Sequence, residues 1–183
     1  MLGVSTGSFP RMPTVTVERT YLQLLAPGAE RTAPKPLAGT CIAEESPCSV
    51  ETYRELYREV GRAYFWLDRL SWSDEVLATY LARPDVRIWI LRDADGIGGY
   101  FELAMGTDRA VEVAYFGLVP SRHGRGLGRA LLARAIDSGW EWGASRIWLH
   151  TCTLDGPAAL PNDLARGFVP FKRETYLAVL PDA

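Results

Sequence analysis

Residues 111–129 read Val-Glu-Val-Ala-Tyr-Phe-Gly-Leu-Val-Pro-Ser-Arg-His-Gly-Arg-Gly-Leu-Gly-Arg. The part before the proline is rich in β-branched and aromatic residues, which favours a strand. Beyond the glycines, apolar residues recur at helical spacing, at Leu127, Leu131, Ala135 and at Leu132, Ile136, Trp140. Gly143 marks the expected end of that helix. The stretch therefore predicts a strand, a glycine-rich turn and a helix.

A glycine-rich turn that opens a helix favours the binding of a phosphate. The first N–H groups of a helix lack intrahelical partners, and the helix dipole attracts negative charge. Glycines at 124, 126 and 128 leave no Cβ between a ligand and the backbone. Arg125 and Arg129 lie one helical turn apart and can flank the ligand. The alternative is a purely structural surface loop capped by glycines.

Two common phosphate-binding motifs are excluded. No Gly-Lys-Ser/Thr follows the glycines and the segment has no lysine, so it is not a P-loop. In a dinucleotide fingerprint the first glycine directly follows the strand, whereas here Pro120 and further residues precede Gly124.

Residues 123–128, His-Gly-Arg-Gly-Leu-Gly, instead resemble the acyl-CoA-binding signature of the GNAT acetyltransferase superfamily. That signature is Gln or Arg, any two residues, Gly, any residue, then Gly or Ala. His123 replaces the Gln or Arg, and an imidazole can still donate to a phosphate oxygen. The resemblance covers roughly residues 50–180 and implies acetyl-CoA as the acyl donor. The residues it implies for holding the donor are Leu118, Val119, His123, Gly124, Arg125, Gly126, Gly128 and Arg129.

Glu112 is the candidate general base, because several GNAT enzymes carry a glutamate at a similar place on this strand. Simple alternation groups Glu112 with Ala114, Phe116 and Leu118 on an otherwise apolar face. Desolvation there would raise the pKa of the carboxyl and make it a better proton acceptor near neutrality. The alternative is a buried or edge glutamate that pairs with an arginine.

A second segment departs from the family pattern. Residues 145–180 resemble the superfamily's strand, Asn-initiated helix and Gly-Phe turn, with Asp155 or Gly156 near the Asn position. Many relatives have a tyrosine four residues before the Gly-Phe glycine, where it protonates the leaving thiolate, but this chain has Asp163. An ionised Asp cannot donate a proton unless its pKa is raised, and we expect Asp163 to face solvent. Tyr176, Tyr115, Cys152 or a water are the alternative donors.

The remaining sequence predicts the other elements of one α/β domain with a mixed, largely antiparallel sheet flanked by helices. We expect residues 1–48 to supply a strand (Thr14–Leu25) and a Pro-rich loop, and 49–183 to form the GNAT domain. An apolar stripe predicts a helix from Ser49 to about Leu70, and a shorter one starts at Ser73 and ends before Pro84. Strands are predicted over 86–92, 97–105 and 145–152, and a last one follows Phe168 and ends at 176–180.

Composition excludes several other classes of protein. The chain has 183 residues, 48% of them hydrophobic, which suits one core, and its formal charge of −2 disfavours nucleic acid as a partner. Three cysteines and two histidines suit neither a disulfide framework nor a metal site. No run is long enough to span a membrane and no signal peptide is apparent, so we expect a cytoplasmic protein without a membrane partner.

The expected reaction is transfer of an acetyl group to a primary amine of a small molecule or peptide, by direct attack with Glu112 as base. Residues 64–72 are expected to border the acceptor, with Asp68 or Glu102 as its partner. The alternatives are that Phe65 and Trp66 are core and that Asp68 pairs with Arg69 on the surface. The function itself has two rivals, transfer from another acyl-CoA and a non-catalytic CoA-binding regulatory domain. A monomer and a homodimer both remain open.

Overall fold

The computed structural model describes residues 13–27 and 38–180. Over these residues seven strands form a single sheet in the order β2-β3-β4-β5-β6-β1-β7. The strands are β1 Thr14–Leu24, β2 Cys41–Glu44, β3 Val86–Asp93, β4 Gly96–Met105, β5 Ala110–Leu118, β6 Arg146–Cys152 and β7 Val169–Val179. The helices are α1 Val50–Gly61, α2 Asp74–Leu81, α3 Leu127–Glu141 and α4 Ala159–Ala165, with short 3-10 turns η1 Arg62–Tyr64 and η2 Pro120–Arg122.

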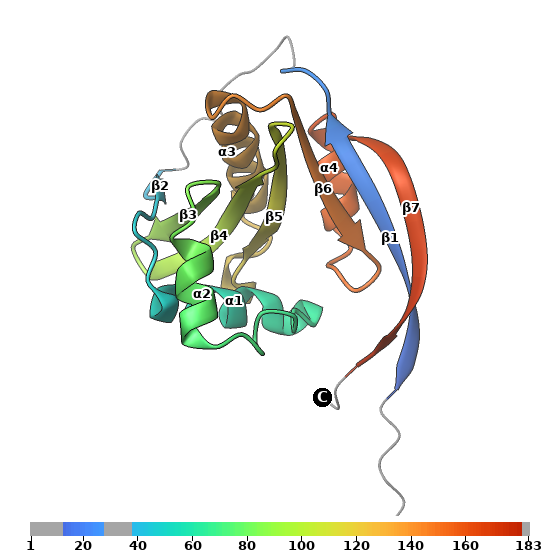
Figure 1. Cartoon of the computed structure of the whole chain (residues 1–183), viewed down its shortest axis with the longest axis horizontal. Helices are drawn as coiled ribbons and strands as arrows, with labels where there is room; N and C mark the ends of the chain where they lie inside the picture. The colour runs from blue at the N-terminus through green and yellow to red at the C-terminus, as the bar shows by residue number, and fades with distance from the viewer. Residues whose placement is uncertain (1–12, 28–37, 181–183) are drawn as a thin grey trace, which may run out of the picture.

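The sheet is antiparallel except at its middle. β5 and β6 run parallel, joined by the crossover through α3, and their ladder covers only Ala110–Glu112 against Arg146–Trp148. Figure 1 shows the two strands starting together and separating toward α1. The mixed, largely antiparallel α/β sheet predicted from the sequence is therefore confirmed.

Helices cover both faces of the sheet. Leu127, Leu131 and Leu132 of α3 pack on one face in a core with Val111, Val113 and Ile147. On the other face, Tyr53, Leu56 and Val60 of α1 and Leu77 of α2 pack against Ile88, Ile90 and Tyr100. The strand before the glycine-rich turn thus lies between two cores, and these fix the direction of its side chains.

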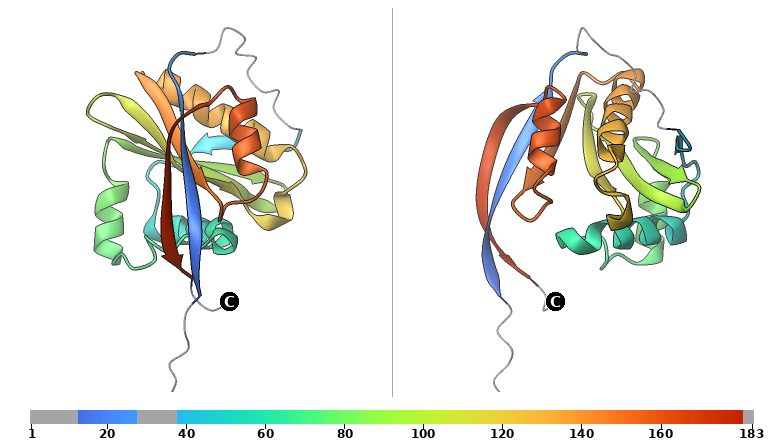
Figure 2. Two further views of the ribbon diagram at one scale, coloured as in Figure 1. Left: turned by 90° about the vertical axis from the view of Figure 1, so that its right-hand side faces the viewer. Right: turned by 180° about the vertical axis from the view of Figure 1, so that it is seen from behind.

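The N-terminal strand is an interior strand of this sheet. β1 pairs antiparallel with β6 on one side and with β7 on the other. Figure 2 shows β1 and β7 running side by side as a long ribbon at the edge of the molecule. Pro34 and Pro36 of the expected loop lie outside the described residues, and the division at residues 48 and 49 stays a prediction.

The structure corrects the sequence-based elements in two places. The first helix was expected to reach Leu70, but α1 ends at Gly61, where a Cβ would collide with Trp66, and Phe65 has a left-handed φ of 55°. The chain then turns back, which brings Asp68 and Arg69 into contact with Tyr53 and Tyr57 of α1. Strand β2 was not predicted, because it is only four residues long and is held by its pairing with β3.

Candidate active site

The glycine-rich turn has the geometry of a phosphate cradle. Gly124 and Gly126 have φ values of 74° and 76°, which L side chains adopt only with strain. A Cβ at either position would meet nothing within 4 Å, so the space above the backbone is open. Arg125 and Arg129 form no ion pair within the part of the chain that the structure describes.

The start of α3 keeps its backbone donors free. Helices α1 and α2 are both capped by a serine side chain, at Ser49 and Ser73, whereas Gly126 at the start of α3 provides no side-chain cap. The Ala130 N–H donates to Gly126 O at 3.4 Å, and the N–H groups that precede it in the first turn have no intrahelical acceptor. These donors and the open space above the glycines fit the phosphates of a CoA.

Arg122, which the sequence analysis overlooked, anchors the cradle to the sheet. Its guanidinium is buried and donates to both carboxylate oxygens of Asp93, at 2.7 and 3.0 Å. Asp95 lies 3.4 Å away on the same β3–β4 turn. Arg122 is thus turned away from a ligand, and no local motif in the sequence links it to a hairpin about 30 residues earlier.

Three residues expected to contact the acyl donor, Leu118, Val119 and His123, form hydrogen bonds within the protein. Nε2 of His123 lies 3.1 Å from Leu118 O, so this nitrogen donates to the backbone and not to a phosphate. The Val119 N–H donates to Gly98 O at 3.0 Å. His123 therefore helps to close the turn through this bond to Leu118 O.

Glu112 does not share a face of the sheet with Phe116 and Leu118, contrary to the grouping expected from simple alternation. The β4–β5 register shifts between Glu102↔Tyr115 and Leu103↔Val113, which leaves Ala114 as an extra residue. The bulge reverses the alternation, so that Val113 and Phe116 both face the α3 core. The grouping of Glu112 with Phe116 and Leu118 was wrong, and Glu112 shares the α1 face with Tyr115.

The environment of Glu112 raises its pKa to about 7, first through desolvation and then through the nearby charge of Glu102, with Arg69 acting in the opposite direction. The direction agrees with the expectation from the sequence. The side chain is half-buried, and it forms no hydrogen bond or ion pair with the described residues. On the neighbouring strand it is in register with Trp148, at the last paired position before β5 and β6 separate.

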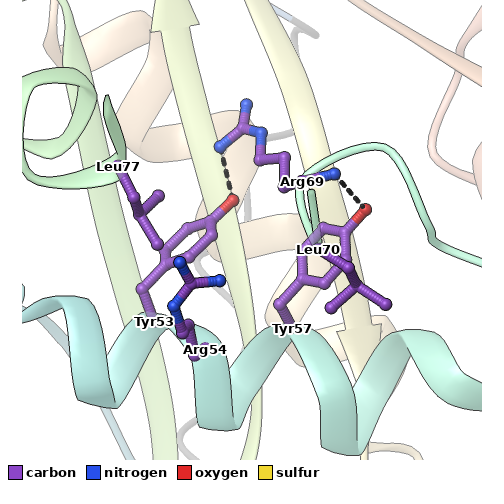
Figure 3. A pocket seen from close by; sticks show the side chains of 6 residues that line it. All are labelled: Tyr53, Arg54, Tyr57, Arg69, Leu70 and Leu77. Carbon is purple, nitrogen blue, oxygen red and sulfur yellow. Dashed lines mark hydrogen bonds between the residues drawn. The ribbon is translucent and has the colours of Figure 1, made fainter. Parts of the chain in front are cut away.

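A buried ion pair lies beside Glu112 on the same face. Glu102 is fully buried and binds Arg69 through two bonds of 2.8 Å, while the hydroxyls of Tyr53 and Tyr80 also donate to it. Figure 3 shows Arg69 reaching over α1 to the hydroxyl of Tyr53, and its backbone N–H pointing to the hydroxyl of Tyr57. The guanidinium also lies over the rings of Tyr53, Trp72, Tyr80 and Tyr115.

Asp68, the other expected partner of an amine, is also engaged internally. It accepts hydrogen bonds from the hydroxyls of Tyr57, at 2.5 Å, and Tyr115. These bonds outweigh burial and lower its pKa. The alternative in which Asp68 and Arg69 pair on the surface is wrong, because Arg69 is only 8% exposed and pairs with Glu102. The alternative that Phe65 and Trp66 are core residues is confirmed for Trp66, which packs against the α1 core. Phe65 is 36% exposed.

Asp163 does not face solvent. Its residue is only 5% exposed, and burial followed by the charge of Asp155 raises its pKa to about 7. The expectation was wrong because α4 packs against the sheet through Leu160, and the nearby Phe168 is buried in the same core. Asp155 caps the end of β6, accepting from Thr151 Oγ1 and Cys152 N, so it does not cap α4, which begins at Ala159.

One alternative proton donor is already committed, because the Tyr115 hydroxyl donates to Asp68. The Tyr176 hydroxyl accepts from Arg19 at 3.0 Å, and this bond leaves its own proton free. Burial raises the pKa of Cys152, which keeps it a thiol. Across residues 13–27 and 38–180 no group of three or more His, Cys, Asp or Glu side chains is placed to hold a metal ion. In the same ranges, no helix combines the length and apolar character needed to cross a bilayer.

Comparisons with known proteins found relatives in sequence and in fold. The chain is 39% identical over 77 residues to an uncharacterized N-acetyltransferase of Mycobacterium tuberculosis and to one of Mycobacterium bovis. The match covers 42% of this chain and 49% of each relative, so it spans about half the length of those proteins.

Among solved structures, a GCN5-related N-acetyltransferase from Kribbella flavida superposes with a TM-score of 0.63 at 20% identity, covering 93% of this chain and 61% of that one. A GCN5-related N-acetyltransferase from Sphaerobacter thermophilus superposes with a TM-score of 0.65 at 15% identity, covering 92% of this chain and 53% of that one. An aminoglycoside acetyltransferase from an uncultured soil metagenomic sample superposes with a TM-score of 0.56 at 15% identity, covering 70% of this chain and 86% of that one. These likenesses show a shared fold. Residues 51–161 match the sequence profile of one family, and the chain belongs to that family, the acetyltransferase (GNAT) family.

Proposed function

We propose that the protein is an N-acetyltransferase that moves the acetyl group of acetyl-CoA to a primary amine of a small molecule or peptide. The observation that carries the proposal is the arrangement along β5. The strand ends in the open, uncapped phosphate cradle, and it bears Glu112 where it separates from β6. An acyl donor held by its phosphates at 124–129 could extend between the strands toward Glu112.

The residues of the cradle would hold the donor through its pyrophosphate. The backbone N–H groups at the start of α3 donate to phosphate oxygens, and Arg125 and Arg129 add charge. Beyond the last parallel pair, β5 and β6 have no ladder to each other, so their facing backbone groups are available to an extended ligand. A backbone N–H near Leu118 would polarise the thioester carbonyl.

Glu112 would act on the acceptor. Its raised pKa, about 7, leaves a useful fraction ionised near neutrality and makes the carboxylate a competent acceptor for the ammonium proton. The neutral amine can then attack the carbonyl, forming the C–N bond as the C–S bond breaks. Asp68 and Glu102 are both bonded internally, so Glu112 is the carboxylate of this face that is free for the acceptor.

The fold does not determine which amine is the acetyl acceptor. The likeness to an aminoglycoside acetyltransferase is at 15% identity and does not transfer its substrate. The rival reactions, use of another acyl-CoA and CoA binding without chemistry, remain alternatives to be tested.

The test is release of free CoA from acetyl-CoA and from longer acyl-CoAs, measured over a panel of amines for the parent and for Glu112→Gln. Turnover of one amine by the parent, reduced in the variant at equal CoA affinity, is expected. CoA binding without turnover of any amine would favour the regulatory alternative, and absence of CoA binding would refute the proposal.

A further inference from the structure

His150 is a titratable group that the proposed reaction has not used. It lies on β6 two residues beyond Trp148, which is in register with Glu112. Because side chains alternate along a strand, His150 points to the same face as Trp148 and Glu112. It follows the last parallel pair, so it lies on the β6 side of the place where β5 and β6 separate (Figure 1).

The imidazole of His150 is accessible and chemically uncommitted. The residue is exposed, and no hydrogen bond joins its ring to the described residues. The ring of Tyr21 meets it edge-on at 5.6 Å between centroids, which fixes its orientation from the β1 side. The imidazole can therefore exchange protons with a ligand without breaking an internal bond.

Charged groups from several elements act on this ring. They are Arg19 on β1, Asp68 on the α1–α2 segment, Asp155 after β6 and Glu174 on β7. Partial desolvation comes first, Arg19 second, and together they outweigh the three carboxylates, so the pKa of His150 falls below 6.5. At neutral pH the ring is uncharged and can accept a proton.

The proton balance of the proposed reaction includes a second transfer, for which a neutral imidazole is suited. An ammonium that becomes an amide nitrogen loses one proton before attack and another once the C–N bond has formed. Glu112 can take the first and pass it to water. The second must leave the nitrogen while the departing sulfur gains one, and no tyrosine is present at 163 to supply it.

We propose that His150 accepts the second proton from the nitrogen and delivers it to the departing sulfur. This inference rests on the proposed acetyl transfer. The C–N bond forms and the C–S bond breaks, the nitrogen becomes a neutral amide, the sulfur leaves as a thiol, and His150 ends uncharged as it began. The net proton released to water is the one that Glu112 removed.

The acidities agree with this direction of transfer. A thiol has a pKa of about 8.5, so an imidazolium whose pKa lies below 6.5 gives up its proton to a thiolate favourably. Tyr115, on the opposite strand, is a poor donor because its hydroxyl is held by Asp68 and its pKa is raised well above the ordinary range.

The test is chemical rescue. In His150→Ala, kcat should fall by about 10²-fold or more, as for loss of a general acid–base group, with unchanged CoA affinity. Added imidazole should restore turnover in proportion to its neutral fraction. Thr175→Ala, at an exposed position of β7, is the control and should be close to the parent. Parent-like turnover in His150→Ala, or a loss that imidazole does not relieve, would overturn the proposal.

A second measurement does not depend on turnover. The chain has two histidines, so NMR titration of the imidazole signals, assigned by their loss in His150→Ala, reports His150 directly. We expect a pKa below 6.5 and a displacement of the His150 signal when CoA binds. If calorimetry shows CoA binding but the signal does not respond, the role of His150 is refuted. If CoA does not bind at all, the proposed function fails as well.

Discussion

Replacing Asp163 with Asn should raise the stability of the variant relative to the parent progressively as pH rises. Burial and Asp155 raise the pKa of this carboxyl from 3.8 to about 7 in the folded chain. Below pH 3.8 it is protonated in both states and carries no penalty. Between 3.8 and about 7 the unfolded chain ionises while the folded chain stays protonated, so the free energy of unfolding falls as pH rises.

The size of the effect follows from these two pKa values. At about 1.4 kcal/mol per pKa unit, the full penalty above pH 7 is roughly 4 kcal/mol, and somewhat less than half of it is already present at pH 5. An unpaired buried amide in Asp163→Asn costs roughly 1–3 kcal/mol, but this cost does not depend on pH. The stability difference between variant and parent should therefore grow by about 3 kcal/mol from pH 5 to pH 8.

Urea unfolding of both proteins at the two pH values measures this difference. Glu55→Gln, which removes one exposed charge from α1, is the control and should show no such growth. A difference that is the same at pH 5 and pH 8 would mean that Asp163 is ionised in the folded chain at both, and the argument from burial would be refuted. Turnover of the same variant decides a second question. A fall of about 10²-fold would make Asp163 the proton donor and contradict the role given to His150.

Three further predictions concern the cradle and the base. Gly126→Ala should weaken acetyl-CoA binding at least 10-fold by calorimetry (about 1.4 kcal/mol), because its Cβ projects into open space over the uncapped donors; a folded variant with parent affinity would contradict the phosphate site. The turnover of the parent should rise as pH passes through about 7 and Glu112 ionises. This rise in the pH–rate profile should be absent in Glu112→Gln, and the difference in rate from the parent should shrink as more amine becomes neutral. A variant that keeps the rise near pH 7 would place the base elsewhere. Arg122→Met should leave Asp93 without its partner and loosen the cradle, lowering both thermal stability and CoA affinity; Arg83→Met, which breaks an exposed pair with Asp85, is the control and should change neither.

The parts of the structure that follow local sequence rules could be predicted, and those set by distant contacts could not. Strands over 86–93 and 96–105, and the serine that starts α2, agree with alternation and capping because neighbouring residues determine both. The cradle was predictable for the same reason, since its glycines and the helix that follows are contiguous. The end of α1 was not, because Gly61 stops the apolar stripe through packing against Trp66.

The face of Glu112 shows how a single extra residue changes a functional prediction. Alternation along 112–118 is a sound rule for a regular strand, but the bulge at Ala114 reverses it and nothing in the sequence marks the bulge. The pKa of Glu112 was nevertheless expected to rise, because both faces of this strand are covered by cores and either would desolvate a carboxylate. The direction of the shift was therefore more robust than the placement of the side chain.

Charge pairing on the α1 face is what leaves Glu112 available to an acceptor. Glu102 lies close enough to Glu112 to act on its pKa, and Asp68 is bonded to Tyr115 on the same face, so a protonated amine could in principle pair with any of the three. Arg69 neutralises Glu102, and two tyrosine hydroxyls satisfy Asp68, so neither can take a new cation without losing bonds already formed in the fold. Breaking the buried Arg69–Glu102 pair would leave an uncompensated charge at a cost of roughly 3–5 kcal/mol. In the proposed reaction, an ammonium entering this face would therefore find Glu112 as a carboxylate without an internal partner among the described residues, at the place where the strands separate.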